Sequence, residues 1–377
     1  MLRLHVFFLL LPLCSACNSG SPSGRTDPAA TPTFYTINVP PDSATGAAIT
    51  STLPTDINAR GEIVGYDMDA KLVLRGFFQS PEGALTAVPV PTSASGHGQG
   101  TECFGINASG TAACLDLEGI SSISSSEYPN HASSAFTQTS DGRPKLISIP
   151  GNNVLSSAIN DRGDVAGTYA NVMAGVAYGF LLTRTGTFTS FVLPGSFNFS
   201  AAYIFTVARI TGADEIIGTF YDTNGVAHGF IRSADGEIKR VDPPGAVSQA
   251  NHGTSLNDIN SGGTIVGSAY TSSGNQSFSL APDGSFTVFD PPGTGPSGSS
   301  AHGINSAGII VGTYTDTSSV QHGYMRNLDG TFTVLDDPNA GQTPGTGTSA
   351  GRINDTGQII GTYTTGNGNL TNGFVRK

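Results

Sequence analysis

Short runs rich in Ile, Val, Tyr, Thr and Phe alternate with Gly-containing turns along most of this chain. In the segment Ala301–Pro338, the turn signals Asn305–Gly308 and Asn327–Gly330 separate such runs. Runs bounded by Asn, Asp and Gly are typical of β-strands joined by tight turns. The pattern predicts strands around Ser300–Ile304, Ile309–Thr315, His322–Arg326 and Phe332–Asp336. The sustained apolar spacing of three and four that indicates long amphipathic helices is absent from the sequence.

The dipeptide Ile-Asn, with Gly three residues after the Asn, recurs along the chain. The Asn falls at Asn58, Asn107, Asn160, Asn260, Asn305 and Asn354, and Ile210-Thr211 stands where a further copy is due. Successive copies are 45 to 53 residues apart. A period of four short strands in about 40–50 residues is typical of a β-propeller blade. Asn in the first turn position and Gly in the fourth are expected to form the turns.

A second marker, an alternating strand that ends in Pro, closes the first six units. These strands are Leu85–Pro91, Leu146–Pro150, Phe188–Pro194, Ile238–Pro244, Phe286–Pro292 and Phe332–Pro338. The last unit stops after its third strand, and Phe34–Pro40 has the form of the missing fourth. We therefore predict an all-β, seven-bladed β-propeller over residues 33–377, with four-stranded blades. The N-terminal strand would complete the last blade and close the ring, whereas an open solenoid would need polar capping repeats.

The units read G-I-N-x-x-G-x-I-V-G-x-Y, then H-G-F/Y, then G-x-F-x-x-x-D-x-P. This pattern resembles the bacterial extracellular HAF-type repeat, and the resemblance covers nearly the whole of residues 33–377. The second unit departs from it, with Ala112-Ala113-Cys114 in place of Ile-Val-Gly, and the fourth unit lacks the Asn. The resemblance is structural and implies no catalytic residues.

The N-terminus carries the signature of export. Residues 1–16 have a basic start and a short apolar run, which is typical of a secretory signal peptide and too short to span a bilayer. Ser15-Ala16-Cys17 resembles the bacterial lipoprotein signal, in which the Cys is lipidated, although Cys14 stands where Leu is usual. An ordinary secretory signal is the alternative. Residues 17–32 are rich in Ser, Gly and Pro and predict a flexible tether. We expect an outer-membrane lipoprotein or an extracellular or periplasmic protein.

The charge balance of the chain limits the classes of partner that it is expected to bind. The chain has 17 Lys and Arg against 28 Asp and Glu, a formal net charge of −11. Nucleic acids and anionic membranes need clustered Lys and Arg, so neither is expected as a partner. Membrane contact is expected only through the lipid anchor, which leaves a glycan or a surface protein as the partner.

Cys103 and Cys114 flank the turn Asn107–Gly110 on two strands that the pattern pairs. In a directly paired register the two residues lie opposite each other, and export makes an oxidising compartment expected. We predict a disulfide between them. A bulged turn would shift the register by one residue and place the sulfurs on opposite faces; reactive free thiols are the alternative.

No metal, cofactor or reaction is legible in the sequence. His228 and His322 precede Gly at matching positions, but no carboxylate or second His stands near either at ligand spacing, so no metal site is predicted. The sequence has no nucleophile elbow, zinc-binding helix, phosphate loop or dinucleotide loop, and no cofactor is expected.

The long loops are the expected place for ligand-binding residues. The connections opposite the Asn-x-x-Gly turns are longer and more varied, and function tends to lie on such loops. The longest insertion carries Tyr128 and His131. The first strands place charged or ionisable residues near the axis, namely Asp56, Arg209, Asp258, His302 and Arg352. Mutual neutralisation of these charges near the channel, or their exposure to solvent, is the structural interpretation, because buried charges are usually paired.

Three functions remain compatible with the sequence. The first is an exported binding or scaffold module of the cell envelope, with a glycan or protein ligand on the long-loop face. The second is a polysaccharide lyase or hydrolase that uses Asp56, Asp258, His302 and the two Arg at the channel mouth. The third is a purely structural envelope protein.

Overall fold

The computed structural model describes residues 33–40, 47–88, 100–118, 132–149, 153–171, 176–193, 206–250, 252–366, 368 and 370–377. These residues form strands and turns, and no helix is found among them. Accordingly, no helix in this part of the chain is long and apolar enough to cross a membrane. The predicted all-β class is confirmed. The signal peptide, the tether with Cys17, and the candidates Tyr128 and His131 lie outside the described residues.

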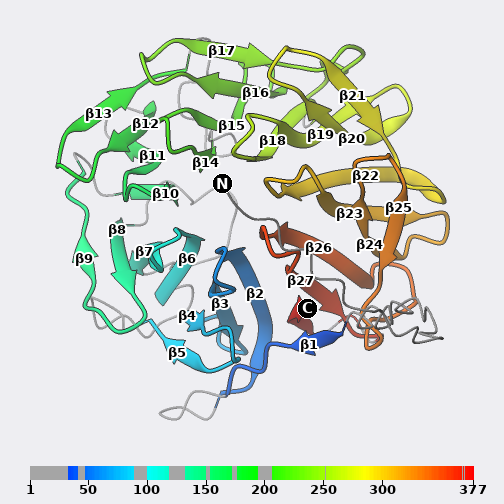
Figure 1. The fold of residues 1–377 in the computed structure, drawn as a ribbon, viewed down its shortest axis with the longest axis horizontal. Coiled ribbons are helices and arrows are strands. Elements are labelled where there is room, and N and C mark those ends of the chain that lie inside the picture. Colours follow the sequence, from blue (N-terminus) through cyan, green and yellow to red (C-terminus); the bar gives the residue numbers. More distant parts are fainter. Residues whose placement is uncertain are drawn as a thin grey trace, which may run out of the picture. The chain divides into compact units, whose positions relative to one another are not determined.

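Consecutive strands pair antiparallel in groups of four (Figure 1). The early groups are β2 (Ile49–Ile57), β3 (Ile63–Asp69), β4 (Leu74–Gln79) and β5 (Leu85–Ala87), then β6 (Gly100–Ile106), β7 (Thr111–Glu118), β8 (Ala132–Thr139) and β9 (Lys145–Leu146). Next come β10 (Asn153–Ile159), β11 (Val165–Asn171), β12 (Val176–Leu182) and β13 (Phe188–Phe191), then β14 (Thr206–Ile210), β15 (Ile216–Tyr221), β16 (Ala227–Arg232) and β17 (Ile238–Val241).

The later groups follow the same plan. They are β18 (Thr254–Ile259), β19 (Ile265–Thr271), β20 (Gly274–Leu280) and β21 (Phe286–Phe289), then β22 (Thr294–Ile304), β23 (Ile310–Asp316), β24 (Gln321–Arg326) and β25 (Phe332–Leu335), and finally β26 (Gly347–Ile353), β27 (Ile359–Thr364) and β28 (Thr371–Arg376) with β1 (Phe34–Thr36). The strands predicted within Ala301–Pro338 are confirmed, and the first of them begins earlier than expected.

The first strand of each group lies toward the middle of the arrangement in Figure 1. These inner strands are β2, β6, β10, β14, β18, β22 and β26, and residues at the C-terminal end of every one line a single cavity. The strand groups therefore share a common axis, and the Asn-x-x-Gly turns that follow the inner strands meet around it.

The N-terminal strand joins the C-terminal one, as the sequence predicted. β1 pairs antiparallel with β28, with Tyr35 opposite Val375. The pairing continues at both ends of β1, where Thr33 N–H donates to Lys377 O at 3.0 Å and Ile37 N–H to Gly373 O at 2.8 Å. The centroid of the Phe34 ring lies 5.1 Å from the centroid of the Phe374 ring. The unpaired edge of β28 is thereby covered.

Large aromatic side chains fill the space between neighbouring groups. Tyr324 in β24 is fully buried and packs with Val266 of the preceding group. The Gly of the Ile-Val-Gly motif makes room for such a ring: a Cβ on Gly312 would lie 2.7 Å from the Tyr324 ring and 2.2 Å from Ser300 O. Gly65, Gly218, Gly267 and Gly361 admit an aromatic ring from the adjacent strand of their own group in the same way.

The Asn-x-x-Gly turns have the predicted structure. Asn58 Oδ1 accepts the N–H groups of Arg60 and Glu62, both at 3.0 Å. Gly61 has a φ of 80°, a conformation that favours glycine. The same pattern at the other copies explains why Asn and Gly recur at this spacing.

The same asparagines also bond one strand group to the next, which the sequence did not indicate. In each case Nδ2 donates to the backbone oxygen of the corresponding residue one group further on: Asn58 to Asn107, Asn107 to Asn160, Asn160 to Thr211, Asn260 to Asn305, Asn305 to Asn354, and Asn354 back to Asn58, at 3.0–3.4 Å. We call these bonds the asparagine ring. Its gap falls between Thr211 and Asn260, because Thr has no amide to donate.

A bulge precedes most of these turns. The ladder between the first and second strands skips one residue three positions before the Asn or Thr, at Thr55, Phe104, Ala208, Asn257, His302 and Gly351. A bulge re-aims the side chains beside it and increases the local twist. The residue after the bulge is Asp56, Arg209, Asp258 or Arg352 in four of these strands.

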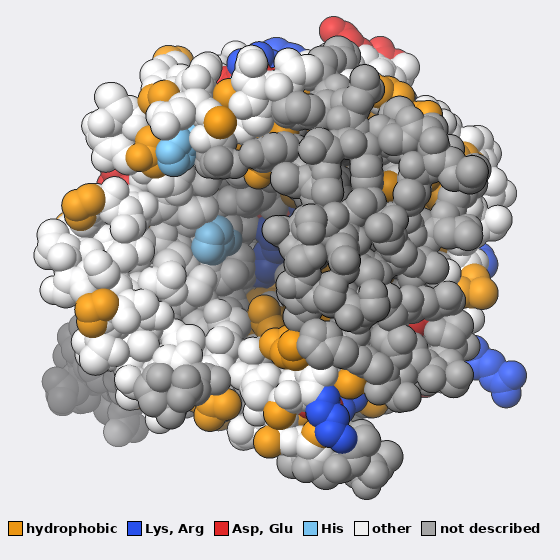
Figure 2. Space-filling view, turned by 180° about the vertical axis from the view of Figure 1, so that it is seen from behind, with side chains coloured by type: hydrophobic (Ala, Val, Ile, Leu, Met, Phe, Trp, Pro, Cys, Tyr) orange, Lys and Arg blue, Asp and Glu red, His pale blue; other side chains and the backbone are white. Residues whose placement is uncertain are grey.

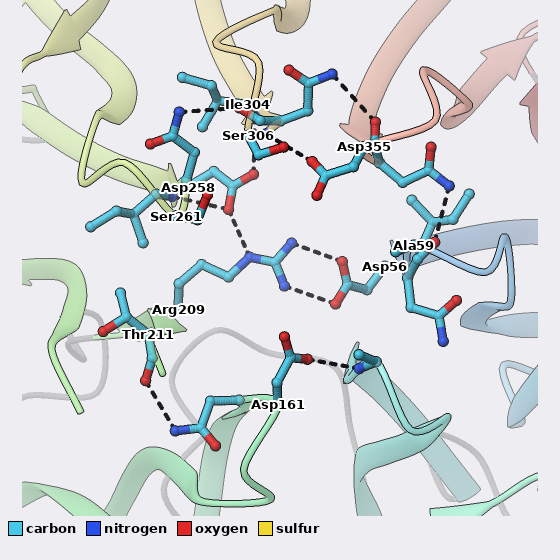
Figure 3. A pocket seen from close by; sticks show the side chains of 18 of the residues that line it. Asp56, Ala59, Asp161, Arg209, Thr211, Asp258, Ser261, Ile304, Ser306 and Asp355 are labelled. Carbon is cyan, nitrogen blue, oxygen red and sulfur yellow. Dashed lines mark hydrogen bonds and ion pairs between the residues drawn. The ribbon is translucent and has the colours of Figure 1, made fainter. Parts of the chain in front are cut away.

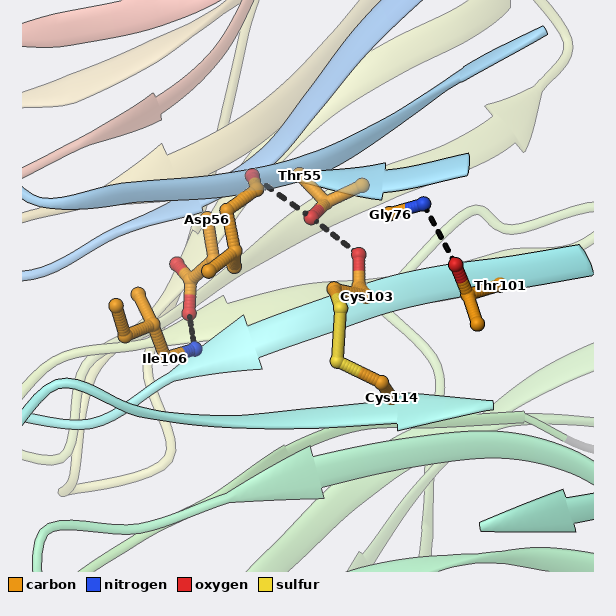
Figure 4. The surroundings of a disulfide bond; sticks show 8 residues. Thr55, Asp56, Gly76, Thr101, Cys103, Ile106 and Cys114 are labelled. Carbon is orange, nitrogen blue, oxygen red and sulfur yellow. Dashed lines mark hydrogen bonds between the residues drawn. A yellow bond between two sulfur atoms is a disulfide. The ribbon is translucent and has the colours of Figure 1, made fainter. Parts of the chain in front are cut away.

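The bulge also explains the disulfide. Cys103 and Cys114 are bonded, with their Cα atoms 4.0 Å apart (Figure 4). The turn does shift the register, so that Ile106 faces Ala112, but the bulge at Phe104 restores it and places Cys103 directly opposite Cys114. Both cysteines are fully buried. The adjoining group contacts this strand where the Thr55 hydroxyl donates to Cys103 O at 2.6 Å.

Filling the gap in the asparagine ring should stabilise the protein. Thr211 Oγ1 already accepts the N–H groups of Ala213 and Glu215, as an Asn side chain would. Thr211→Asn adds an amide that can donate to Asn260 O, and we expect the free energy of unfolding in urea to rise by about 0.5–1.5 kcal/mol. Thr211→Asp is the matched control, because it keeps the acceptor and lacks the donor. Equal stability of the two variants would contradict the role given to the ring.

Candidate functional site

Four charged side chains meet on the axis because the bulge places them there. Asp56 in β2, Arg209 in β14, Asp258 in β18 and Arg352 in β26 each follow a bulge and stand two residues before the turn residue Asn or Thr. We call them the axial cluster. They come from strands far apart in the sequence, so only the arrangement of the groups around one axis brings them together.

Arg209 lies at the centre of the axial cluster (Figure 3). Its Nη1 and Nη2 donate to the two carboxylate oxygens of Asp56 at 2.8 and 2.7 Å, and its Nε donates to Asp258 Oδ1 at 2.8 Å. A bidentate arginine–carboxylate pair is among the strongest hydrogen-bonded ion pairs in proteins. Arg209 therefore links strand groups on opposite parts of the axis.

The carboxylates are also bonded to the neighbouring groups. Asp56 Oδ2 accepts the N–H of Ile106 at 3.0 Å, and Asp258 Oδ2 accepts the N–H of Ile304 at 3.1 Å. Burial raises the pKa of Asp56, but the charge and hydrogen bonds of Arg209 outweigh it and hold that pKa below its usual value. Burial lowers the pKa of Arg209, and the two carboxylates more than reverse this effect. Both Arg209 and Asp56 are therefore charged at neutral pH.

Arg352, the fourth member of the axial cluster, is held next to His302. Arg352 Nη1 donates to Asn257 O at 2.9 Å and to His302 O, and it lies 3.6 Å from Asp258 Oδ2. His302 Nδ1 donates to Ala350 O at 2.9 Å, since a carbonyl can only accept. Burial and the nearby Arg352 charge lower the pKa of His302, so the ring is neutral at pH 7.

A cavity of about 300 Å³ opens beside the cluster, among the Asn-x-x-Gly turns. Its floor includes Asp56, Arg209 and Asp258. Its rim is formed by the residue that follows the Asn or Thr of each turn: Ala59, Ala108, Asp161, Gly212, Ser261, Ser306 and Asp355. Asp161 and Asp355 each accept a backbone N–H from the preceding rim residue, at 2.7 and 2.8 Å. The lining combines carboxylates, hydroxyls and one guanidinium with the Ile side chain that precedes each turn.

The structure brings together part of the predicted site. Asp56, Arg209 and Asp258 line one cavity, while Arg352 and His302 contact each other without lining that cavity. The cavity is on the face of the short turns, whereas the sequence directed attention to the long loops. The difference arises because every repeat contributes one short turn to the same small circle.

His228 and His322 differ from the expectation that no carboxylate lies near them. His228 lies 3.0 Å from Asp242 through Nδ1 and 3.5 Å from Asp222 through Nε2. His322 repeats this arrangement with Asp336 at 2.9 Å and Asp316 at 3.5 Å. Other groups place Gln276 and Arg75 at the same position, and Gln276 donates to Asp290 and accepts from Thr271.

His228, His322 and Gln276 are therefore interchangeable polar bridges between a turn and the end of the outer strand, whereas Arg75 pairs with Asp67 and Asp69 of β3. No set of three His, Cys, Asp or Glu side chains suited to a metal ion occurs within the described ranges.

Glu102 in β6 is a residue that the sequence did not single out. It is half-buried opposite Leu115 in the ladder, and no hydrogen bond or ion pair to it is found in the described part of the chain. Burial raises its pKa to about 7. The only sequence signal was a lone Glu within an otherwise apolar or small-residue strand.

Comparison with known proteins supports the fold. No protein-family model matches the chain, and no curated protein matches it. Among solved structures, the chain is similar to the β-propeller domain of the Trilobed protease from Pyrococcus furiosus, with a TM-score of 0.54 and 10% identity over 88% of this chain and 94% of that one. It is also similar to the BP39L lectin from Burkholderia pseudomallei, with a TM-score of 0.50 and 10% identity over 86% and 97% of the two chains.

The chain also matches TolB from Acinetobacter baumannii, with a TM-score of 0.41 and 12% identity over 83% of this chain and 63% of that chain. At these identities the first two likenesses show the fold alone. The chain is an all-β protein of the β-propeller type.

Glu102 makes a testable contribution to the pH dependence of stability. Its pKa of about 7 in the folded protein exceeds the ordinary 4.5, so folding favours the neutral carboxyl. The contribution of the neutral Glu102 carboxyl to stability is then fully present below about pH 4.5 and is lost as the pH rises through 7. Glu102→Gln should raise the free energy of unfolding at pH 8 by about 1–3 kcal/mol and have little effect at pH 4.5. The exposed Glu237 supplies the control, Glu237→Gln, and a pH-independent effect of Glu102→Gln would refute the assignment.

Proposed function

We propose that this protein is a closed, seven-bladed β-propeller that works as a binding or scaffold module. Each strand group would be one blade, and the pairing of β1 with β28 would complete the last one. What supports closure is the bond from Asn354 back to Asn58, together with the seven inner strands that contribute to one cavity. A ring of this kind holds a shared pocket in a fixed shape.

Binding is favoured over catalysis by the state of the axial cluster. Asp56 and Asp258 share Arg209 and accept backbone N–H groups, so neither carboxylate has a free role. The lowered pKa of Asp56 removes it as a general acid at neutral pH. A lyase or hydrolase would need at least one of these groups to exchange a proton with the substrate.

The observation that carries the proposal is the polar cavity on the turn face. Sugar hydroxyls both donate and accept hydrogen bonds, and the rim offers matching groups in Ser261, Ser306, Asp161 and Asp355. A cavity of about 300 Å³ is at the lower end of the range for small-molecule sites and fits one or two sugar units. We therefore propose a glycan ligand at this face.

The setting follows from the N-terminal sequence. A basic start, a short apolar run and Ser15-Ala16-Cys17 support export and a lipid anchor at Cys17. Displayed on a flexible tether, the propeller would bind a glycan or a surface protein of the cell envelope. A purely structural role is the alternative, and it predicts no specific ligand at either end of the axis.

A glycan screen on the full mature chain tests the proposal. We expect at least one glycan to bind, and Ser306→Tyr to weaken its binding at least tenfold by filling the cavity. The control is Leu328→Tyr, in the outer turn Asn327–Gly330, where the side chain is 74% exposed and does not line the cavity. Absence of any glycan above background, or equal binding by the two variants, would contradict a ligand in this cavity.

A further inference from the structure

Arg352 carries an unused edge of hydrogen-bond donors. Its Nη1 donates both of its protons, one to Asn257 O and one to His302 O. The remaining three N–H groups, on Nε and Nη2, have no partner in the part of the chain that the structure describes. This Nε–Nη2 edge is one that arginine uses to bind a carboxylate with two parallel hydrogen bonds. The side chain is 21% exposed.

The charge of Arg352 is only partly compensated. Its nearest carboxylate, Asp258, is 3.6 Å away and already bonds Arg209, Ile259 and Ile304. Burial and the like charge of Arg209 both lower the pKa of Arg352, which means that the protein disfavours the cation at this place. An anion bound at the free edge would relieve that cost.

His302, whose carbonyl accepts from Arg352 Nη1, also has an acceptor on its ring. Arg352 and His302 are in contact through the His302 carbonyl. Because Nδ1 carries the proton that bonds Ala350 O, Nε2 of the neutral ring is an unprotonated acceptor. It has no partner within the described ranges. A hydroxyl next to a carboxylate would find an acceptor at His302 and a donor pair at Arg352.

This pair lies on the side of the axial cluster away from the turn-face cavity. The backbone oxygens that hold Arg352 belong to the bulge residues Asn257 and His302, one position further from the turns than Asp258. Neither Arg352 nor His302 lines the turn-face cavity. Figure 2 shows the molecule from behind, with a hollow near its middle in which a His and a Lys or Arg side chain are visible.

We propose that Arg352 and His302 form a second binding site, specific for a carboxylate with a neighbouring hydroxyl, as in an acidic sugar. Arg352 binds the carboxylate through Nε and Nη2, and His302 Nε2 accepts the hydroxyl proton. The site is separated from the turn-face cavity by the ion pairs of Arg209. It therefore does not depend on the function proposed for that cavity.

Calorimetric titration of the wild-type mature chain tests the chemistry without any variant. The ligands are glucuronate, glucose, which lacks the carboxylate, and acetate, which lacks the hydroxyl. We expect glucuronate to bind at least tenfold more tightly than either of the others. Failure of glucuronate to bind, or binding of glucose or acetate as tight as that of glucuronate, would overturn the proposal.

Two variants then locate the ligand. Arg352→Lys keeps the charge and loses the two-donor edge, so glucuronate affinity should fall at least tenfold while thermal unfolding stays cooperative. Leu328→Tyr, on an exposed outer turn, should leave glucuronate affinity unchanged. Loss of glucuronate affinity with Ser306→Tyr but not with Arg352→Lys would overturn this site and assign the acidic sugar to the turn-face cavity. A lysine variant that is folded and binds as tightly as wild type would likewise refute the site.

Discussion

The hydrogen bond from one asparagine side chain to the next asparagine backbone is the interaction on which the arrangement of the strand groups depends. Each such residue satisfies its own turn through Oδ1 and reaches the adjacent group through Nδ2, as Asn58 does toward Asn107. At the other face, single bridges between third and first strands join the same neighbours, such as Gln321 with Gly347. A Cβ on Gly347 would lie 2.0 Å from Gln321 O, so glycine is required there. The groups that begin with β22 and β26 are thus bonded at both ends of their inner strands.

The axial cluster follows from the same geometry. A bulge precedes six of the seven turns, and in four of these strands the residue after it is a charged side chain at the axis. Two acids and two bases give the cluster no net charge, which agrees with the rule that buried charges occur in pairs. Arg209 divides the axis into two polar ends of different chemistry. The turn-face end has carboxylates and hydroxyls, and the other end has the free edge of Arg352.

Local signals were enough for the sequence to predict the strands, the turns and the partner of the N-terminal strand. The sequence could not predict the side-chain bonds between strand groups, because the bonded residues are far apart along the chain. Arg209 and Asp56 are 153 residues apart, and Asn354 and Asn58 are 296 apart. The sequence did not predict the carboxylate of Asp242 beside His228 for a similar reason, since the pairing of β16 with β17 brings the two residues together. The shared position of Arg209, Asp258 and Asp56 in their strands predicted that they lie near the axis. Their bonds to one another depend on the bulge, which no residue pattern in the sequence indicates.

The most direct test of the asparagine ring is the stability of Asn354→Asp, at the bond that returns from the last group to the first. The aspartate keeps the Oδ1 acceptor for Gln358 N–H and loses the amide that donates to Asn58 O. The account predicts that the free energy of unfolding in urea falls by about 1–3 kcal/mol. Asn327→Asp, in an outer turn whose amide bonds only Thr331, should have a far smaller effect. Equal losses in the two variants, or no loss at Asn354, would contradict the claim that side-chain amides hold the groups around the axis.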